Sequence, residues 1–215
     1  VLQRTPCGFD RVVEHLGSVT DAGVVDAAMA GVDGVIHLAA KVDPVGDWAD
    51  FEATNVDGTA AVHAAARAAG VSRFVYVSSP SVAHDGSSIS GEGAAPADPE
   101  QARGHYSVSK AMAERAVLAA SDPTMPVVAV RPHLVIGPGD TQLIGRIVDR
   151  ARNGRMPLIG SGLALVDTTW VDNAATSLLA ALDALPGVGS RAFVVSNGEP
   201  RTVNELIARI TAACL

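Results

Sequence analysis

Asp33-Gly-Val-Ile-His-Leu38 and Arg73-Phe-Val-Tyr-Val-Ser78 are two short apolar runs rich in Val and Ile, and a longer helical pattern at residues 50–69 lies between them. Each run has the length and composition of a strand that is buried on both faces of a sheet. A strand, a helix and a second strand in this order form a βαβ unit with parallel strands. Residues 33–78 therefore predict an α/β fold around a parallel sheet.

The same alternation continues on both sides of this unit. Further strands are expected at residues 12–16, 127–130 and 191–196. Further helices are expected at residues 22–30, 105–120, 140–153, 173–184 and 203–213, several of which begin with a capping residue or end at Gly. Residues 80–104 are rich in Pro, Gly and Ser and are predicted to form a long connection, of the kind that is usually a functional lid or a disordered segment. The 215 residues fit one principal domain.

Composition narrows the class of protein. Hydrophobic residues make up 48% of the chain and charged residues 18%, which is typical of a globular enzyme, and no long uncharged apolar run predicts a membrane span. A net charge of -7 speaks against nucleic acid as the main partner, because phosphate binding requires a basic face. Cys7 and Cys214 are far apart and the six histidines show no ligand spacing, so neither a disulfide scaffold nor a metal site is expected. A cytoplasmic location fits this cysteine usage best.

Tyr106 and Lys110 stand four residues apart in a chain that has only two tyrosines and two lysines. On a helix, side chains at this spacing lie next to each other on one face. An ammonium beside a phenol favours the phenolate, so the pKa of Tyr106 is expected to be lowered and the phenol to serve as a general acid or base. A lysine head can also bond two neighbouring hydroxyls of a ribose. A solvated helix face with an accidental tyrosine is the alternative interpretation of the pair alone.

Six segments follow one another in an order that is more specific than any one of them. They are Val35-Ile-His-Leu-Ala-Ala40, Asn55-Val-Asp-Gly-Thr59, Phe74-Val-Tyr-Val-Ser-Ser79, Tyr106-x-x-x-Lys110, Arg131-Pro-His-Leu-Val-Ile-Gly-Pro-Gly-Asp140 and Thr168-Thr-Trp-Val-Asp-Asn173. Over essentially the whole chain they resemble the extended short-chain dehydrogenase/reductase superfamily, in particular its 3β-hydroxysteroid dehydrogenase-like branch and the related NAD-dependent epimerases and dehydratases. The resemblance implies a Rossmann-like, doubly wound parallel sheet that binds NAD(P) at the carboxyl ends of its strands.

The resemblance also implies a catalytic set of Ser79, Tyr106 and Lys110. Tyr106 would pass the proton, Lys110 would hold the ribose and keep the phenol acidic, and Ser79 would stabilise charge on the substrate oxygen. The residues expected to bind the cofactor are Arg4, Ser18, Val19, Leu38, Ala39, Ala40, Asn55, Val77, Tyr106, Lys110, Pro132 and His133. Ordinary core packing for the alanines, a polar helix face for the asparagine and a structural role for the histidine are the alternatives. For Asp172 the resemblance implies support of the substrate loop, capping of the next helix is an equal alternative, and no catalytic role is assigned to it.

The chain departs from the family pattern in two places. No glycine-rich pyrophosphate loop is present, and Val1-Leu-Gln-Arg4 resembles the end of the second strand, so a first βα unit of about thirty residues is expected to be missing. By the same resemblance, a further substrate-covering region is expected to follow the helix at residues 203–213. Ser18 stands where the family usually has an acidic residue that reads adenine. Because Gln3 and Arg4 occupy the positions that select the ribose, NADP is preferred to NAD.

The predicted function is that of an NAD(P)-dependent oxidoreductase, which transfers a hydride between the nicotinamide and a secondary alcohol or ketone of a hydrophobic substrate, such as a sterol or a long-chain oxo acid. The alternatives are a nucleotide-sugar epimerase or dehydratase of the same superfamily and a non-catalytic nucleotide-sensing or scaffold protein. Residues 1–135 are expected to bind the cofactor, and residues 136–215 to contribute substrate-binding segments interleaved with the last strands and helices. The Ala-rich helices at residues 50–69 and 105–120 are compatible with a homodimer.

Overall fold

The chain divides into two units. The computed structural model describes residues 1–86, 93–141, 143–156, 160–185 and 187–214. Unit 1 contains Val1–Arg131 and Leu178–Val194, and unit 2 contains Pro132–Ser177 and Val195–Leu215. Unit 2 thus begins four residues before the expected boundary at residue 136, and the assignment of this unit to the substrate stays a prediction. Across the described part of the chain, no helix has both the length and the apolar character that crossing a membrane requires.

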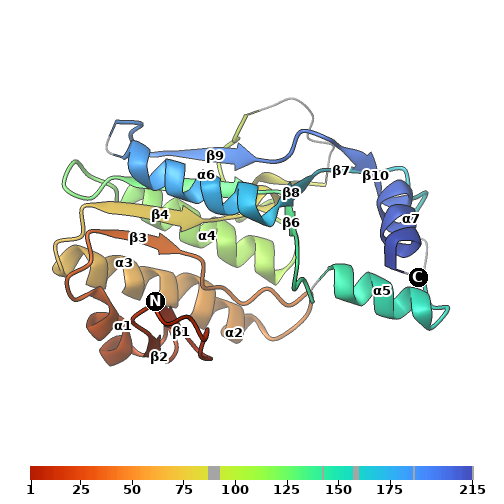
Figure 1. Cartoon of the computed structure of the whole chain (residues 1–215). Helices are drawn as coiled ribbons and strands as arrows, with labels where there is room; N and C mark the ends of the chain where they lie inside the picture. The colour runs from red at the N-terminus through yellow and green to blue at the C-terminus, as the bar shows by residue number, and fades with distance from the viewer. Residues whose placement is uncertain (87–92, 142, 157–159, 186, 215) are drawn as a thin grey trace. The chain divides into compact units, whose positions relative to one another are not determined.

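Unit 1 is built on a four-stranded sheet in the order β3–β4–β5–β9 (Figure 1). Its strands are β3 (Gly34–His37), β4 (Arg73–Val77), β5 (Val127–Pro132) and β9 (Arg191–Val195). The first three are parallel, and His37 on β3 lies directly opposite Tyr76 on β4. The Val-rich middle strands β4 and β5 are almost wholly inaccessible, as parallel strands covered on both faces should be. The predicted α/β fold with a parallel sheet is confirmed.

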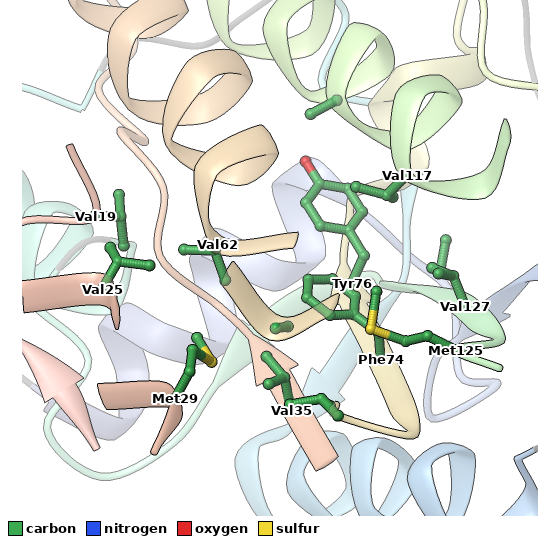
Figure 2. Packing of buried hydrophobic residues seen from close by; sticks show 14 residues of the cluster. Val19, Val25, Met29, Val35, Val62, Phe74, Tyr76, Val117, Met125 and Val127 are labelled. Carbon is green, nitrogen blue, oxygen red and sulfur yellow. The ribbon is translucent and has the colours of Figure 1, made fainter. Parts of the chain in front are cut away.

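Helices cover both faces of this sheet. The helices that lie wholly in unit 1 are α1 (Ala22–Met29), α2 (Trp48–Phe51), the π-helix η1 (Glu52–Asp57), α3 (Gly58–Ala68), the 3-10 helix η2 (Pro80–Ala83) and α4 (His105–Ala119). α3 and α4 lie on one face, where Phe74 and Tyr76 of β4 pack with Val62 and Val117 (Figures 1 and 2). On the other face, Leu182 of α6 (Val171–Ala184) lies against β3.

Three expected elements of unit 1 differ from the structure. The strand expected at residues 12–16 is reduced to β2 (His15–Leu16), which pairs with β1 (Leu2–Gln3), because the Glu14 carboxylate turns to accept hydrogen bonds from the Gln3 side chain and the Cys7 N–H. The helix expected at residues 50–69 begins at Trp48 and contains the π-helical turn η1. The connection expected at residues 80–104 opens with η2, and residues 87–92 lie outside the described residues.

Unit 2 contains two small strand pairs and two further helices. Its elements are β6 (Leu134–Ile136) parallel to β8 (Thr168–Trp170), β7 (Leu165–Val166) antiparallel to β10 (Arg201–Thr202), and α5 (Ile144–Arg152) packed against α7 (Val203–Cys214). The helix expected from residue 140 begins only at Ile144, because the Asp140 carboxylate accepts from the N–H groups of Leu143 and Ile144 at 2.9 and 3.2 Å.

Asp172 does not cap a helix. α6 begins at Val171, one residue before it, so that Asp172 belongs to the first turn. Its carboxylate accepts a hydrogen bond from the indole N–H of Trp170 at 3.1 Å. The capping alternative is therefore wrong, and the carboxylate instead bonds the Trp170 indole at the end of β8; support of a substrate loop stays a prediction.

Candidate active site

The first two turns of α4 present Tyr106 and Lys110 side by side. The chain enters this helix through Gly104, whose φ of 84° lies in the left-handed region that favours glycine. Four residues separate the phenol from the ammonium, which places both on one side of the helix. Lys110 is only 2% exposed and Tyr106 is partly buried. The pair therefore lies at the boundary between the interior and the solvent.

Ser79 lies two residues beyond β4, and its hydroxyl lies beside the Tyr106 phenol. The serine caps η2: its Oγ accepts from the Ser81 N–H at 3.3 Å and lies 2.9 Å from the Ser81 Oγ, so the turn itself holds the hydroxyl in place. Burial raises the pKa of Tyr106, and the neighbouring Ser79 hydroxyl opposes part of this rise. The predicted lowering of this pKa is wrong, because withdrawal of the phenol from water outweighs the stabilisation of the phenolate.

Two neighbouring residues of β4 contact the Lys110 ammonium. Nζ donates a hydrogen bond to the Val77 carbonyl at 2.7 Å and lies 4.1 Å from the centroid of the Tyr76 ring. Burial lowers the pKa of Lys110 to about 7, while the Glu114 carboxylate acts in the opposite direction. A lysine with this pKa can change its charge near neutral pH, which is a common property of groups in catalytic sites.

A buried ion pair lies one helical turn beyond Lys110. Arg131 donates through Nε to one oxygen of Glu114 at 2.9 Å and through a terminal nitrogen to the other oxygen, and its remaining terminal nitrogen donates to the Ala95 carbonyl at 2.7 Å. Both side chains are no more than 2% exposed. This two-pronged pairing satisfies a charge that would otherwise be expensive to bury. Glu114 was not predicted as part of the site, although a spacing of four residues on a helix indicates that its side chain is adjacent to that of Lys110.

Asn55 links three segments of the site from within the π-helical turn η1. Its Oδ1 accepts from the Lys41 N–H at 2.7 Å, and its Nδ2 donates to the Lys41 carbonyl at 3.1 Å and to the Ser109 hydroxyl at 2.9 Å. Ser109 in turn donates to the Tyr106 carbonyl at 2.9 Å. Such π-helical turns frequently occur at functional sites. Asn55 thus bonds backbone near the site, as expected, and its contact with a cofactor stays a prediction.

The ends of β3 and β4 bring together a second group of the predicted cofactor residues. Leu38, Ala39 and Ala40 directly follow β3; the leucine is exposed, whereas Ala39 packs against the core. Val77 ends β4 and supplies the carbonyl that Lys110 bonds. Because these strands are parallel neighbours, the two segments lie at the same edge of the sheet as the catalytic candidates.

The predicted cofactor residues near the amino end follow β1 and β2. Arg4 is exposed directly after β1. Ser18 accepts hydrogen bonds from the Thr20 N–H and hydroxyl at 3.2 and 2.8 Å, while Val19 is buried in the core of unit 1. Because the Val19 side chain is buried, this residue would have to contact a cofactor through its backbone. The cofactor contacts of Arg4, Ser18 and Val19 stay predictions.

Pro132 and His133 belong to unit 2. Pro132 ends β5, and the His133 N–H donates to the Val195 carbonyl at 2.8 Å. The backbone of the histidine is therefore engaged in its own unit. Its predicted contact with cofactor or substrate stays a prediction.

His37, a buried residue of β3, also lies near the site, and this position was not predicted from the sequence. His37 Nε2 lies 2.9 Å from the Thr59 hydroxyl, and its ring lies 5.9 Å from that of Tyr76. Burial, with a contribution from the charge of Lys110, lowers the pKa of His37 to about 3. His37 is consequently neutral and lies close enough for the charge of Lys110 to act on it, and no spacing in the sequence indicated that the two residues are near each other.

A parallel sheet wound on both faces, with a serine, a tyrosine and a lysine gathered at the carboxyl end of a central strand, defines a Rossmann-fold protein of the short-chain dehydrogenase/reductase and NAD-dependent epimerase/dehydratase type. A profile of the 3-beta hydroxysteroid dehydrogenase/isomerase family matches residues 6–212. The chain belongs to this family, whose named members include reductases and dehydrogenases. The resemblance drawn from the sequence is confirmed.

Individual relatives agree with this assignment. The chain is 44% identical over 202 residues to the 2-alkyl-3-oxoalkanoate reductase of Stenotrophomonas maltophilia, which covers 92% of this chain and 61% of the relative. It is 33% identical over 211 residues to the decarboxylating sterol-4-alpha-carboxylate 3-dehydrogenase of Mus musculus. This alignment covers 94% of this chain and 58% of the relative. A solved dTDP-glucose 4,6-dehydratase, DesIV of Streptomyces venezuelae with NAD and TYD bound, superimposes with a TM-score of 0.81 at 26% sequence identity. The superposition covers 96% of this chain and 65% of the dehydratase chain. The chain thus spans about three fifths of the length of the two reductase and dehydrogenase relatives.

Proposed function

We propose that the protein is an NAD(P)-dependent oxidoreductase in which Tyr106 transfers a proton to or from the oxygen of a ketone or secondary alcohol. The observation that carries this proposal is that the Ser79 hydroxyl lies close enough to the Tyr106 phenol to act on its pKa, with Lys110 buried one turn farther along α4. These are three different functional groups at one strand end, and each matches one task of carbonyl reduction: polarising the oxygen, supplying the proton and holding charge.

The residues at the ends of β3 and β4 fit the nicotinamide half of a dinucleotide. Ala39 and Ala40 have small side chains that allow close approach of the backbone, and Lys110 has an N–H left for a ribose hydroxyl after its contacts with Val77 and Tyr76. When bound, NAD(P) supplies or accepts the hydride. The NAD in the solved dehydratase supports this cofactor class. Exposed Arg4 after β1 supports a preference for NADP, since Arg accommodates the 2′-phosphate.

In the direction of reduction, the chain's own residues would supply the proton and the hydrogen bonds. Because burial raises the pKa of Tyr106, the phenol is protonated at neutral pH and can donate to the carbonyl oxygen as that oxygen gains negative charge. The Ser79 hydroxyl donates a hydrogen bond to the same oxygen. A bound NAD(P)H would supply the hydride of the new C–H bond, Tyr106 supplies the proton of the new O–H bond, and Tyr106 is then reprotonated from solvent. A charged Lys110 stabilises the phenolate that exists between these two steps.

The substrate that we propose is a hydrophobic oxo or hydroxy compound, such as a 3-oxo acid or a sterol derivative. The named activities of the reductase and dehydrogenase relatives support this class. So do the exposed apolar side chains of Leu38, Val42 and Val45, which directly follow β3. The solved dehydratase supports a second candidate, a nucleotide-sugar epimerase or dehydratase. A cytoplasmic homodimer that pairs through the Ala-rich helices α3 and α4 completes the proposal.

The test uses the protein expressed from its complete reading frame. Oxidation of NADH and NADPH is followed by absorbance with panels of ketones, 3-oxo acids and nucleotide sugars. Tyr106→Phe should lower turnover by about 10²–10⁴-fold, the usual contribution of a positioned acid, and leave cofactor binding close to that of the parent. Ser72→Ala, which removes an exposed hydroxyl away from the site, is the control. Near-parental turnover by Tyr106→Phe would refute the role of the phenol, and turnover of nucleotide sugars alone would favour the second candidate.

A further inference from the structure

We propose that Tyr76 is a positioning residue for Lys110: the face of its ring holds the lysine head in place and stabilises its charged form inside the protein. The inference deepens the proposed function and rests on the part given there to Lys110. It concerns a residue of the sheet that lies in the hydrophobic core and contacts neither of the other two candidates for catalysis through a hydrogen bond.

The contact has the geometry of a cation–π interaction. Lys110 Nζ lies 4.1 Å from the centroid of the Tyr76 ring, well inside the distance of about 6 Å at which such attraction is effective. The ring is fully buried and the lysine is 2% exposed, and removal of water strengthens the attraction. The next residue of the same strand, Val77, accepts the hydrogen bond from Nζ. Two consecutive residues of β4 therefore fix the position of the lysine head.

The titratable groups around Lys110 do not neutralise its charge, so the Tyr76 ring is important for stabilising it. Tyr106 and Glu114 lie one turn to either side on α4, neutral His37 faces it from β3, and Arg131 on β5 is bound to Glu114. The Glu114 carboxylate is thus shared with a permanent cation. Among the described residues, no carboxylate lies within ion-pair distance of Lys110. A buried ammonium without a paired carboxylate needs another source of negative potential, and the Tyr76 ring supplies it.

The hydroxyl of Tyr76 does not explain why an aromatic residue occupies this position. It lies beside Thr59 but makes no hydrogen bond of good geometry, since the Thr59 hydroxyl is engaged with His37. Figure 2 shows the side chain leaving β4 toward the helices, with the ring between the strand and Val117 of α4. The ring contributes packing on one side and a negative face to Lys110 on the other.

Fluorination of this ring separates the two contributions. In the complete protein, Tyr76 is replaced by Phe and by mono-, di- and trifluorinated phenylalanine, which keep nearly the same shape while the negative face weakens step by step. The Lys110 pKa is followed by NMR of isotope-labelled lysine and assigned from the signal that Lys110→Met lacks. We expect this pKa to fall by about one pH unit across the series, with Tyr76→Phe close to the parent. The alkaline limb of the kcat/KM profile should move to lower pH in step.

Phe74 provides the matched control, because it is buried on the same face of the same strand and contacts His37 and His63 instead of the lysine. The same fluorinated residues placed at Phe74 should leave the Lys110 pKa unchanged. A Lys110 pKa that stays constant across the Tyr76 series, or that moves as much in the Phe74 series, overturns the inference. If the pKa moves in the Tyr76 series and the activity limb does not, the ring contact stands and the part given to Lys110 in the proposed function is wrong.

Discussion

Lys110→Met should make the protein more stable, by an amount that shrinks as the pH rises. The native state holds this lysine 2% exposed, and burial lowers its pKa from 10.5 to about 7. Between these two pH values the unfolded chain binds a proton that the folded chain releases, so the stability of the parent increases with pH in this window. Methionine fills a similar volume without a charge, and it removes this dependence.

The size of the effect follows from the pKa values. At 1.36 kcal/mol per pKa unit, the buried lysine destabilises the folded state by about 5 kcal/mol at pH 6, where it must remain charged. At pH 9 it is neutral in the folded state, and the cost of giving up its proton is about 2 kcal/mol. Packing of either side chain is independent of pH. The advantage of Lys110→Met should therefore fall by about 3 kcal/mol between pH 6 and pH 9.

Urea unfolding of the parent and the variant at pH 6, 7, 8 and 9 measures this difference, and other titrating groups cancel in the comparison. Lys41→Met is the control, because it also removes an ammonium. Lys41 pairs with Asp43 and Asp50, which raise its pKa, so it is protonated in both states and its substitution should give a difference that is flat with pH. A flat or rising difference for Lys110→Met would refute the argument that desolvation dominates at Lys110.

Three further changes test other parts of the structure. Glu114→Gln leaves a buried guanidinium without its carboxylate and should lower the free energy of urea unfolding by about 3–5 kcal/mol, whereas Glu205→Gln, at an exposed pair, should have little effect. Gly58→Ala places a Cβ 2.8 Å from a valine methyl and should destabilise the fold by about 1–3 kcal/mol in thermal unfolding, while Gly23→Ala, with an ordinary contact at 3.5 Å, should be neutral or stabilising. His37, with a pKa lowered to about 3, should show no ring titration between pH 5 and 8 by NMR, and a midpoint near 6.5 would contradict its burial.

The order of strands and helices could be predicted because it depends on local patterns. The apolar runs at residues 33–38 and 73–78 became β3 and β4 almost as predicted, since a strand buried on both faces needs a continuous apolar sequence. The prediction of a strand over residues 12–16 was wrong for most of its length, and the reason is also physical. The Glu14 carboxylate accepts a hydrogen bond from the Cys7 N–H, and this local hydrogen bond outweighs the preference of the flanking residues for a strand.

The members of the candidate site were predictable, but their electrostatics were not. A spacing of four residues places Tyr106 beside Lys110, yet it carries no information about how much water either group retains. In the structure, burial raises the pKa of the phenol and lowers that of the ammonium, which is opposite to what a simple pair in water would show for both groups. The missing quantity is desolvation, and it depends on β4 and on other segments far away in the sequence.

Tyr76 shows why this information could not be read from the chain. Along β4, the alternation that sends Phe74 and Tyr76 to the same face is a property of any strand, and it identifies both as core residues. Only the packing of α4 across that face brings Lys110 over one ring and not the other. The hydrophobic core therefore reaches the lysine head through the Tyr76 ring. It follows that substitutions around β4 which shift α4 by a fraction of an ångström should change the charge state of Lys110 as well as the stability, because the same ring serves both.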